Sequence, residues 1–197
     1  MPPEQFNQVL AAIPRLKIRK WKDEDIQMLF KILYWCALRF NEGVRLKVED
    51  FDLLTNQIYL GKTKTNKEDY APIPPSFKPE LAVFLVGKTG PLFPGLTYKT
   101  AIWWIKRLGE MLEIRAWTTP QLISGEKTKT HIFRKSIAKD LLYGTYGAEA
   151  PLNIISKHLR HKGDNALAMT SHYIKADLQT VKDWWQKQTP KESDASL

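Results

Sequence analysis

Six polar residues, spread over most of the chain, carry the functional groups that an attack on a phosphodiester requires. They are two arginines, a lysine, two histidines and a tyrosine: Arg39, Lys64, His131, Arg134, His161 and Tyr173. Arginine binds phosphate oxygens through paired hydrogen bonds and keeps its charge, so two arginines could neutralise a five-coordinate transition state. Histidine moves protons near neutral pH, lysine can protonate a departing alkoxide, and tyrosine can act as a covalent nucleophile. The set indicates phosphoryl transfer through a tyrosine.

Each of these features is weak evidence when it is taken alone. A histidine and an arginine three residues apart on a helix arise often by chance, a hairpin lysine is usually a solubilising charge, and a histidine at a helix end usually caps it. The evidence lies in all six residues occurring in one order. A tyrosine with a pKa of about 10 also needs a base and a positive field to ionise at neutral pH. No carboxylate cluster able to hold Mg²⁺ is evident, so no metal and no cofactor are expected.

The first element that must position these residues is a helix that begins near Asp23, a residue suited to cap it. Apolar residues follow at helical spacing, at Ile26, Leu29, Phe30, Leu33 and Ala37. The apolar stripe runs on into Leu38 and Arg39, which predicts that Arg39 closes a buried helix. A charge at such a place needs a partner or a task.

A different pattern follows between Asp50 and Pro74. Three short strands are predicted, over residues 51–54, 57–60 and 70–73, with a turn at Thr55-Asn56. The polar connection GKTKTNKED between the last two strands carries the candidate lysine, and prolines then end the sheet.

Further helices are predicted over residues 98–113, 130–143 and 151–161, and a last one after Asp177, with a loop over 117–129. The second of these helices carries His131 and Arg134, and the third ends at His161. The chain is therefore expected to be a mostly helical α+β domain with a small three-stranded antiparallel sheet inserted after the first helices. The catalytic domain is expected over residues 1–189, followed by a disordered tail at 190–197.

Length and charge limit the class of protein. The 197 residues suffice for one domain with a sizeable core, and 30 Lys+Arg against 21 Asp+Glu give a net charge of +9. Such a surplus favours a polyanionic partner, with nucleic acid ahead of an anionic membrane surface. The single cysteine, Cys36, excludes an internal disulfide. No apolar stretch is long enough to span a membrane and no signal peptide is visible, so an intracellular location is expected.

The densest basic run is RLKIRKWK, over residues 15–22. It fits either a solvated charged face or a segment that follows a phosphate backbone, and the sequence leaves both open. Candidate contacts to double-stranded DNA are the cations of this run and of the segments beside the candidate site: Arg15, Lys17, Arg19, Lys20, Lys22, Lys62, Lys67 and Lys129.

In their order, the six residues resemble those of the tyrosine recombinases, the family that includes phage integrases and Xer-type resolvases. ALRFNEGVRLKVEDFDL is similar to the family's first box, which places its arginine at Arg39 and acidic positions at Glu42 and Asp50. IYLGKTKTNKEDYAPIP is similar to the family's lysine hairpin. Counting back from Pro72 puts the family lysine at Lys64, with Lys62 and Lys67 as alternatives.

The remaining boxes follow in the second half of the chain. HIFRKS resembles the second box, KHLRHK the helix that supplies the next histidine, and SHYIKAD the nucleophile segment. The chain departs from the family in four places. Arg160 stands where glycine is usual, Cys36-Ala37 replaces Thr-Gly, and Ile-Phe replaces Asp-Leu between His131 and Arg134. The gap from His161 to Tyr173 is longer than usual.

The resemblance implies a site-specific recombinase or integrase that works without metal or ATP. Tyr173 would form a 3′-phosphotyrosyl link, Arg39 and Arg134 would clamp the phosphate, and Lys64 would protonate the leaving 5′-oxygen. His131 would accept the tyrosine proton and His161 would bond a phosphate oxygen. It also implies a tetramer on two DNA duplexes, with the last helix packing on a neighbouring subunit or on its own core. The family usually carries an N-terminal DNA-clamping domain, so the chain is expected to be a separated catalytic domain or a minimal member.

Three other readings stay open. A type IB topoisomerase-like enzyme shares the phosphotyrosine chemistry but relaxes supercoils. A DNA-binding protein that has lost catalysis would bind without a covalent product. A zinc site built from His158, His161 and His172 is disfavoured, because no cysteine pair or carboxylate lies at suitable spacing.

Overall fold

The structure is a computed structural model, and it describes residues 1–62, 68–114 and 131–173. For the last two of these residues it describes the backbone alone. The loop predicted over 117–129, the last predicted helix and the predicted tail lie outside these residues. Within the described part, no helix is both long enough and apolar enough to cross a membrane.

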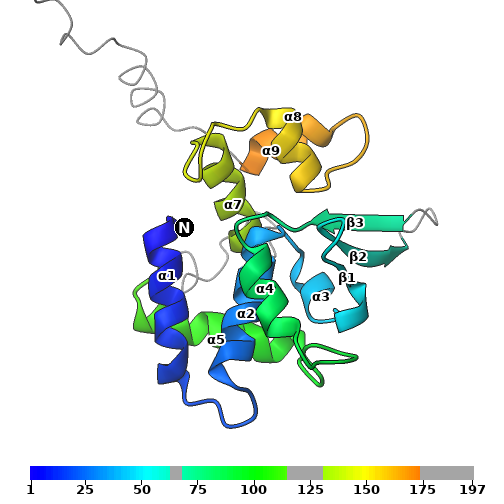
Figure 1. The fold of residues 1–197 in the computed structure, drawn as a ribbon. Helices are drawn as coiled ribbons and strands as arrows, with labels where there is room; N and C mark the ends of the chain where they lie inside the picture. Colours follow the sequence, from blue (N-terminus) through cyan, green and yellow to red (C-terminus); the bar gives the residue numbers. More distant parts are fainter. Residues whose placement is uncertain (63–67, 115–130, 174–197) are drawn as a thin grey trace, which may run out of the picture.

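Helices dominate the chain, and one small sheet follows the first of them (Figure 1). The elements, in order, are α1 Pro3–Ala12, η1 Ile13–Leu16, α2 Asp23–Trp35, α3 Phe40–Gly43, η2 Val48–Asp50, β1 Phe51–Asp52, β2 Gln57–Lys62, β3 Glu68–Pro72, α4 Lys78–Leu85, α5 Tyr98–Met111, α7 Ile132–Leu142, α8 Leu152–His158 and α9 Ala166–Tyr173. The predicted fold class, mostly helical α+β with a three-stranded antiparallel sheet inserted early, is confirmed.

Helix α2 runs through the centre of the core. Its predicted apolar stripe is confirmed, since Ile26, Leu29, Phe30 and Leu33 are at most 1% exposed. The Phe30 ring lies 5.1 Å from the ring of Phe133, which belongs to α7. Burial of this stripe supplies the apolar contact that fixes α2 against α7, and the two helices carry the segments around the candidate site.

The chain leaves α2 earlier than the apolar pattern predicted. The helix ends at Trp35, and Ala37 has a φ of 49°, in the left-handed region that a side chain rarely adopts. Arg39 is the N-cap residue of the next helix, α3, so the prediction that Arg39 closes the apolar helix is wrong. The apolar pattern predicted a longer helix because Ala37 and Leu38 stay fully buried after the helical hydrogen bonds have stopped.

The sheet has the order β1-β2-β3, with both pairs antiparallel. Asn56, in the predicted turn, has a φ of 57°, a conformation that asparagine tolerates better than most residues. Strand β2 extends to Lys62 and β3 begins at Glu68, so the ladder reaches farther toward the lysine-rich connection than predicted. Pro72 lies in the edge strand β3, where its missing N–H is tolerated.

Helix α8 also ends before the predicted residue, at His158. The N–H of Arg160 donates to Lys157 O at 2.9 Å and the N–H of His161 donates to Ser156 O at 3.0 Å. This pair of bonds is the Schellman arrangement, in which the residue after the cap is left-handed, and Arg160 has a φ of 53°. His161 therefore follows the C-terminal cap. The prediction that His161 ends this helix is wrong.

Candidate active site

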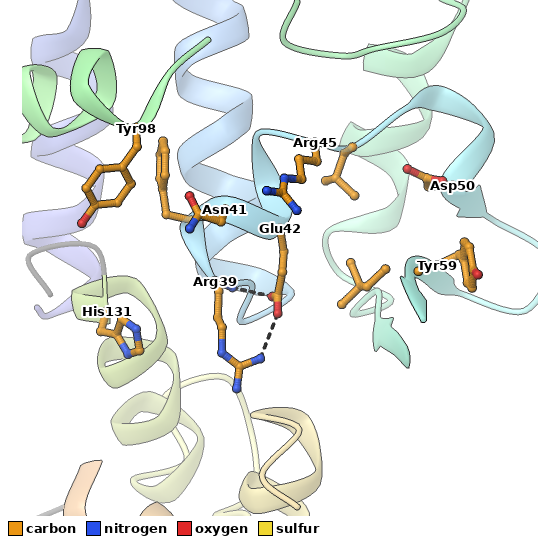
Figure 2. A pocket seen from close by; sticks show the side chains of 12 residues that line it. Arg39, Asn41, Glu42, Arg45, Asp50, Tyr59, Tyr98 and His131 are labelled. Atoms are coloured by element: carbon orange, nitrogen blue, oxygen red, sulfur yellow. Dashed lines mark hydrogen bonds and ion pairs between the residues drawn. The ribbon is translucent and has the colours of Figure 1, made fainter. Parts of the chain in front are cut away.

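A pocket of about 570 Å³ opens between α3, β2 and the starts of α5 and α7. Figure 2 shows its charged and polar lining, with Arg39 and Glu42 on one element and His131 on another. Its lining residues are Arg39, Phe40, Asn41, Glu42, Arg45, Leu46, Asp50, Tyr59, Leu60, Gly61, Tyr98 and His131. Two of the six predicted catalytic residues, far apart in sequence, therefore face one cavity.

Arg39 enters this pocket from the start of α3. Its Nη1 donates to Glu42 Oε1 at 2.8 Å, and its backbone N–H donates to Glu42 Oε2 at 2.6 Å (Figure 2). The Arg39 side chain remains 44% exposed, so it can still meet a ligand. Helix α3 lies so close to α2 that a Cβ at Gly43 would meet Leu33 Cδ2 at 2.8 Å, and glycine permits this approach. The direction of Arg39 thus depends on its own helix and on one carboxylate.

His131 lies at the N-cap of α7, half-buried, and lines the same pocket. Burial, followed by the positive charges of Arg134 and Arg39, lowers its pKa to about 4. The imidazole is therefore neutral at pH 7 and has a lone pair with which to accept a proton.

Arg134 lies one turn into α7 and is fully buried. Its Nη1 donates to Ala37 O and its Nη2 donates to Leu159 O. These carbonyls belong to residues two positions before Arg39 and two positions before His161. Arg134 does not line the pocket, and its hydrogen bonds to these carbonyls join the two chain segments that carry Arg39 and His161.

His161 is buried beside α9. Its Nδ1 lies 2.8 Å from Thr170 Oγ1, and that hydroxyl donates its proton to Ala166 O at 2.9 Å. Because a hydroxyl has one proton, His161 Nδ1 must be the donor in this pair, which leaves the lone pair on Nε2. Burial, followed by the positive charges of Arg134 and Arg39, lowers the pKa of His161 to about 4. Both arginines are thus within electrostatic reach of both histidines.

The other two predicted catalytic residues are less fully described. Lys64 lies outside the described residues, as do Lys67 and Lys129, but β2 lines the pocket with Tyr59, Leu60 and Gly61. The connection that carries Lys64 therefore begins at the pocket's edge, and Lys62 is exposed there. Tyr173 is the last residue of α9, three positions after Thr170, and nothing is described of its side chain.

The predicted basic run does not belong to this pocket. All five cations, Arg15, Lys17, Arg19, Lys20 and Lys22, are exposed. Lys22 caps the start of the 13-residue helix α2, roughly 20 Å of helix away from the end that leads to Arg39. Figure 1 places the loop before α2 at the opposite end of this helix from α8 and α9. Lys20 and Lys22 line a second hollow of about 400 Å³ there, together with Lys88. Their contact with DNA stays a prediction.

Several pocket residues were not predicted from the sequence. Arg45 adds a second exposed cation to the lining, and Tyr98 adds a phenol from the start of α5. Arg45 could have been found, since it lies in the box that carries Arg39. Tyr98 gives no local signal, because it begins an ordinary amphipathic helix. Within residues 1–62, 68–114 and 131–173, no group of three or more potential metal ligands lies together.

The lowered histidine pKa values predict a loss of stability in mild acid. His131, His158 and His161 each have a folded-state pKa of about 4, against an ordinary value of 6.5. Between pH 4 and pH 6.5 the unfolded chain binds more protons than the folded chain. The contribution of these histidines to the free energy of unfolding is therefore fully present above pH 6.5 and falls as the pH drops toward 4. Each group can contribute up to about 1.4 kcal/mol per pH unit, and the half-exposed His131 contributes less.

The measurement is the free energy of unfolding in urea at pH 7, 6 and 5, above the range where most carboxylates titrate. A His158→Gln variant removes one of these histidines at a position outside the predicted catalytic set, and its stability should depend less steeply on pH than that of the wild type. An unfolding midpoint that stays constant from pH 7 to 5 would contradict the assigned directions.

A family model described as the phage integrase family matches residues 1–180. XerA recombinase aligns with a TM-score of 0.68 at 17% identity, over 97% of this chain and 65% of that chain. The catalytic domain of bacteriophage HP1 integrase aligns with a TM-score of 0.58 at 17% identity, over 98% of this chain and 96% of that domain.

A third structure, XerH site-specific recombinase bound to its difH substrate, gives a TM-score of 0.63 at 21% identity, over 96% of this chain and 54% of that chain. A comparison with curated protein sequences finds no significant match. At these identities the structural likeness shows the fold. The chain spans about two thirds of XerA and about half of XerH, and nearly all of the HP1 catalytic domain.

Proposed function

Because this chain belongs to the phage integrase family, the tyrosine recombinases, we propose that it is a site-specific DNA recombinase. It would cleave and rejoin strands through a 3′-phosphotyrosyl intermediate on Tyr173, without metal or ATP. One observation carries the proposal. Arg39 and His131 line one pocket, and the charges of Arg39 and Arg134 act on both candidate histidines. Two arginines and two histidines, the residue types that would neutralise and bond a phosphate, are thus within electrostatic reach of one another, and two of the four line one cavity.

The arginines would have different tasks in this reaction. Arg39 is exposed in the pocket and can offer its fork of N–H donors to two non-bridging phosphate oxygens. Arg134 lies outside the pocket lining, donates to Ala37 O and Leu159 O, and would add a fixed positive charge near the developing negative charge. Neither role requires a group to be ionised or neutralised during the step, because arginine keeps its charge.

Proton movement would fall to His131 and Lys64. The Tyr173 oxygen forms a bond to phosphorus while the bond from phosphorus to the 5′-oxygen breaks. The phenol proton passes to His131, which is neutral at pH 7 because its pKa is about 4. Lys64 gives a proton to the departing 5′-oxygen, leaving a free 5′-hydroxyl. Attack by a 5′-hydroxyl from a second strand reverses each of these transfers and rejoins the DNA.

His161 would bond a phosphate oxygen through Nε2. With Nδ1 donating to Thr170, this nitrogen becomes a donor only when the ring is protonated. A bound phosphate would favour that form, since a nearby negative charge raises the pKa of a histidine. The same bond ties His161 to α9, the helix that ends in Tyr173, so phosphate binding and nucleophile placement would share one hydroxyl.

The proposed partner is double-stranded DNA. XerH was solved bound to difH substrate, and the Tn1549 transposon integrase was solved in complex with circular intermediate DNA. The net charge of +9 fits a polyanionic partner. Four copies on two duplexes, inside a cell, would complete an exchange. The apolar residues of the last predicted helix would pack on a neighbouring copy or on the core of their own copy: Leu178, Val181, Trp184 and Trp185.

The test of this function is a covalent protein–DNA adduct. A pool of nicked suicide duplexes, or supercoiled plasmid, is incubated with the protein and separated on a denaturing gel. A band that contains both protein and DNA supports the proposal. Salt-sensitive binding without any adduct would indicate a DNA-binding protein without catalysis. Plasmid relaxation by isolated monomers, without pairing of two sites, would indicate topoisomerase-like activity.

Arg39→Ala should slow adduct formation by roughly 10²–10³-fold, because it removes fixed positive charge where the transition state gains negative charge. The free energy of unfolding should change by less than about 1 kcal/mol, since the Arg39 side chain is 44% exposed and its ion pair is near the surface. Single-turnover cleavage and urea unfolding measure the two quantities.

Arg45→Ala is the matched control for this change. It removes the same charge from the lining of the same pocket, at a residue that no family position assigns to catalysis. We expect a smaller loss of rate than for Arg39→Ala. Equal losses from the two variants would mean that the pocket acts through its overall charge and that Arg39 has no specific clamp role.

A further inference from the structure

Arg160 is a buried cation outside the six predicted catalytic residues. Its side chain is 4% exposed. Its Nη2 donates to Glu42 Oε2 at 2.5 Å, its Nη1 donates to Cys36 O at 3.5 Å, and its Nε lies 3.6 Å from Asp69 Oδ2. One guanidinium thus contacts α3, the end of α2 and strand β3.

The backbone of Arg160 is in a conformation that favours glycine. Its φ of 53° is left-handed, as the C-terminal cap of α8 requires. The chain therefore carries both local strain and a buried charge at a position where glycine would avoid both. Such costs persist where the surrounding contacts compensate for them, and here the compensating contacts are the two carboxylates.

Glu42 joins Arg160 to the candidate phosphate-binding arginine. Arg39 Nη1 bonds one carboxylate oxygen and Arg160 Nη2 bonds the other. Burial alone would raise the pKa of Glu42, but Arg160 and then the hydrogen bonds from Arg39 lower it below its usual range. The carboxylate is therefore charged at neutral pH and is held from both sides. Removal of Arg160 would leave it held by Arg39 alone.

Asp69 joins the same guanidinium to the lysine hairpin. It lies in β3, just after the connection that carries Lys64, and it also pairs with Lys162 at 2.9 Å. His161, the next residue after Arg160, contacts Thr170. The segments that carry Arg39 and His161, together with strand β3, therefore meet at Arg160 or at its direct partners.

We propose that Arg160 is a positioning residue: it fixes the Glu42 carboxylate so that Arg39 is presented to the pocket, and it docks β3 against the end of α8 through Asp69. It is not a catalytic residue, because its buried side chain does not line the pocket. The catalytic consequence rests on the proposed function. The geometric consequence, an Arg39 side chain ordered by Arg160, does not.

The kinetic test uses Arg160→Gly, which suits the left-handed backbone and so should fold. The cleavage rate at saturating DNA should fall by roughly 100-fold, because Arg39 would lose its orientation. The dissociation constant for DNA should change by at most roughly threefold, because Arg160 neutralises no phosphate. Arg160→Lys keeps a charge but offers one donor point, and it should recover part of the rate. A wild-type rate in Arg160→Gly, or a loss of affinity with an unchanged saturated rate, would overturn the proposal.

Lys162→Ala is the matched control. Lys162 pairs with the same Asp69 but is 58% exposed and does not contact Glu42. Its removal should leave the saturated cleavage rate unchanged. A loss of rate equal to that of Arg160→Gly would overturn the role of Glu42, because the two substitutions share only the contact with Asp69.

A second readout does not depend on activity. In ¹⁵N-arginine NMR spectra, the Arg39 side-chain signal, identified by its loss in Arg39→Lys, should show a slowly exchanging, hydrogen-bonded guanidinium in the wild type and in Lys162→Ala. In Arg160→Gly it should be averaged. An unchanged Arg39 signal would overturn the proposal. If the wild type formed no adduct with any DNA, the proposed function would fail, and these spectra would still decide the role of Arg160.

Discussion

A Tyr173→Phe variant is expected to form no covalent protein–DNA adduct. The substitution removes one oxygen, the proposed nucleophile, and keeps the ring. Loss of a nucleophile typically costs at least about 10⁴-fold in rate, since the remaining groups have nothing to activate. DNA affinity should be retained, because the phenol carries no charge at neutral pH. The measurement is a denaturing gel with nicked duplexes, beside a filter-binding titration.

Tyr98→Phe provides a control with the same chemistry. Tyr98 lines the pocket with Arg39 and His131, so it is another phenol already placed at the candidate site. We expect its adduct yield to stay near that of the wild type. An adduct that survives in Tyr173→Phe and disappears in Tyr98→Phe would move the nucleophile to α5 and reject the assignment made from the SHYIKAD segment.

The buried elements were predictable from the sequence because apolar spacing reports burial. Ile26, Leu29 and Phe30 repeat at helical spacing and are all buried in α2. The three strands were predicted from β-prone segments between turn residues, and the structure extends the second to Lys62. In each case the sequence pattern shows which side chains are buried in the core, and this burial determines whether the segment is a helix or a strand.

The helix ends were not predictable in the same way. Helices α2 and α8 both end at residues followed closely by a left-handed backbone, at Ala37 and Arg160. The usual signal for such an end is glycine, and neither position has one. Both residues replace a glycine that the family usually carries there, so the resemblance held the information that the local pattern lacked. The predicted positions of Arg39 and His161 relative to their helices were wrong for this reason.

The contacts that organise the site were beyond reach of the sequence. Glu42 and Arg160 lie 118 positions apart, and nothing local links an acidic residue of the first box to an arginine after α8. The sequence identified Glu42 as a family position, and Arg160 as a departure from one. Only the fold brings Arg160 into contact with Glu42. The ion pair that compensates for burial of this arginine is therefore a tertiary property.

Arg134→Ala is expected to lower the free energy of unfolding by roughly 3–5 kcal/mol. The substitution leaves two buried carbonyls without the N–H groups that donate to them, and it also leaves a cavity. Arg134 is fully buried and donates to Ala37 O and Leu159 O. The loss should separate the segments that carry Arg39 and His161, and adduct formation should fall with stability. Urea unfolding and the adduct assay measure the two effects.

Two variants show whether the lost hydrogen bonds are the cause. Arg134→Met fills most of the volume but donates to neither carbonyl, so it should remain destabilised by most of the same amount. Lys139→Ala removes an exposed positive charge from the same helix and should change the free energy of unfolding by less than about 0.5 kcal/mol. Wild-type stability in Arg134→Met would show that packing volume, and not the bonds to Ala37 and Leu159, holds these segments together. In that case the bonds from Arg134 would not be required for stability, and the contribution left to Arg134 would be its fixed positive charge beside the proposed phosphate site.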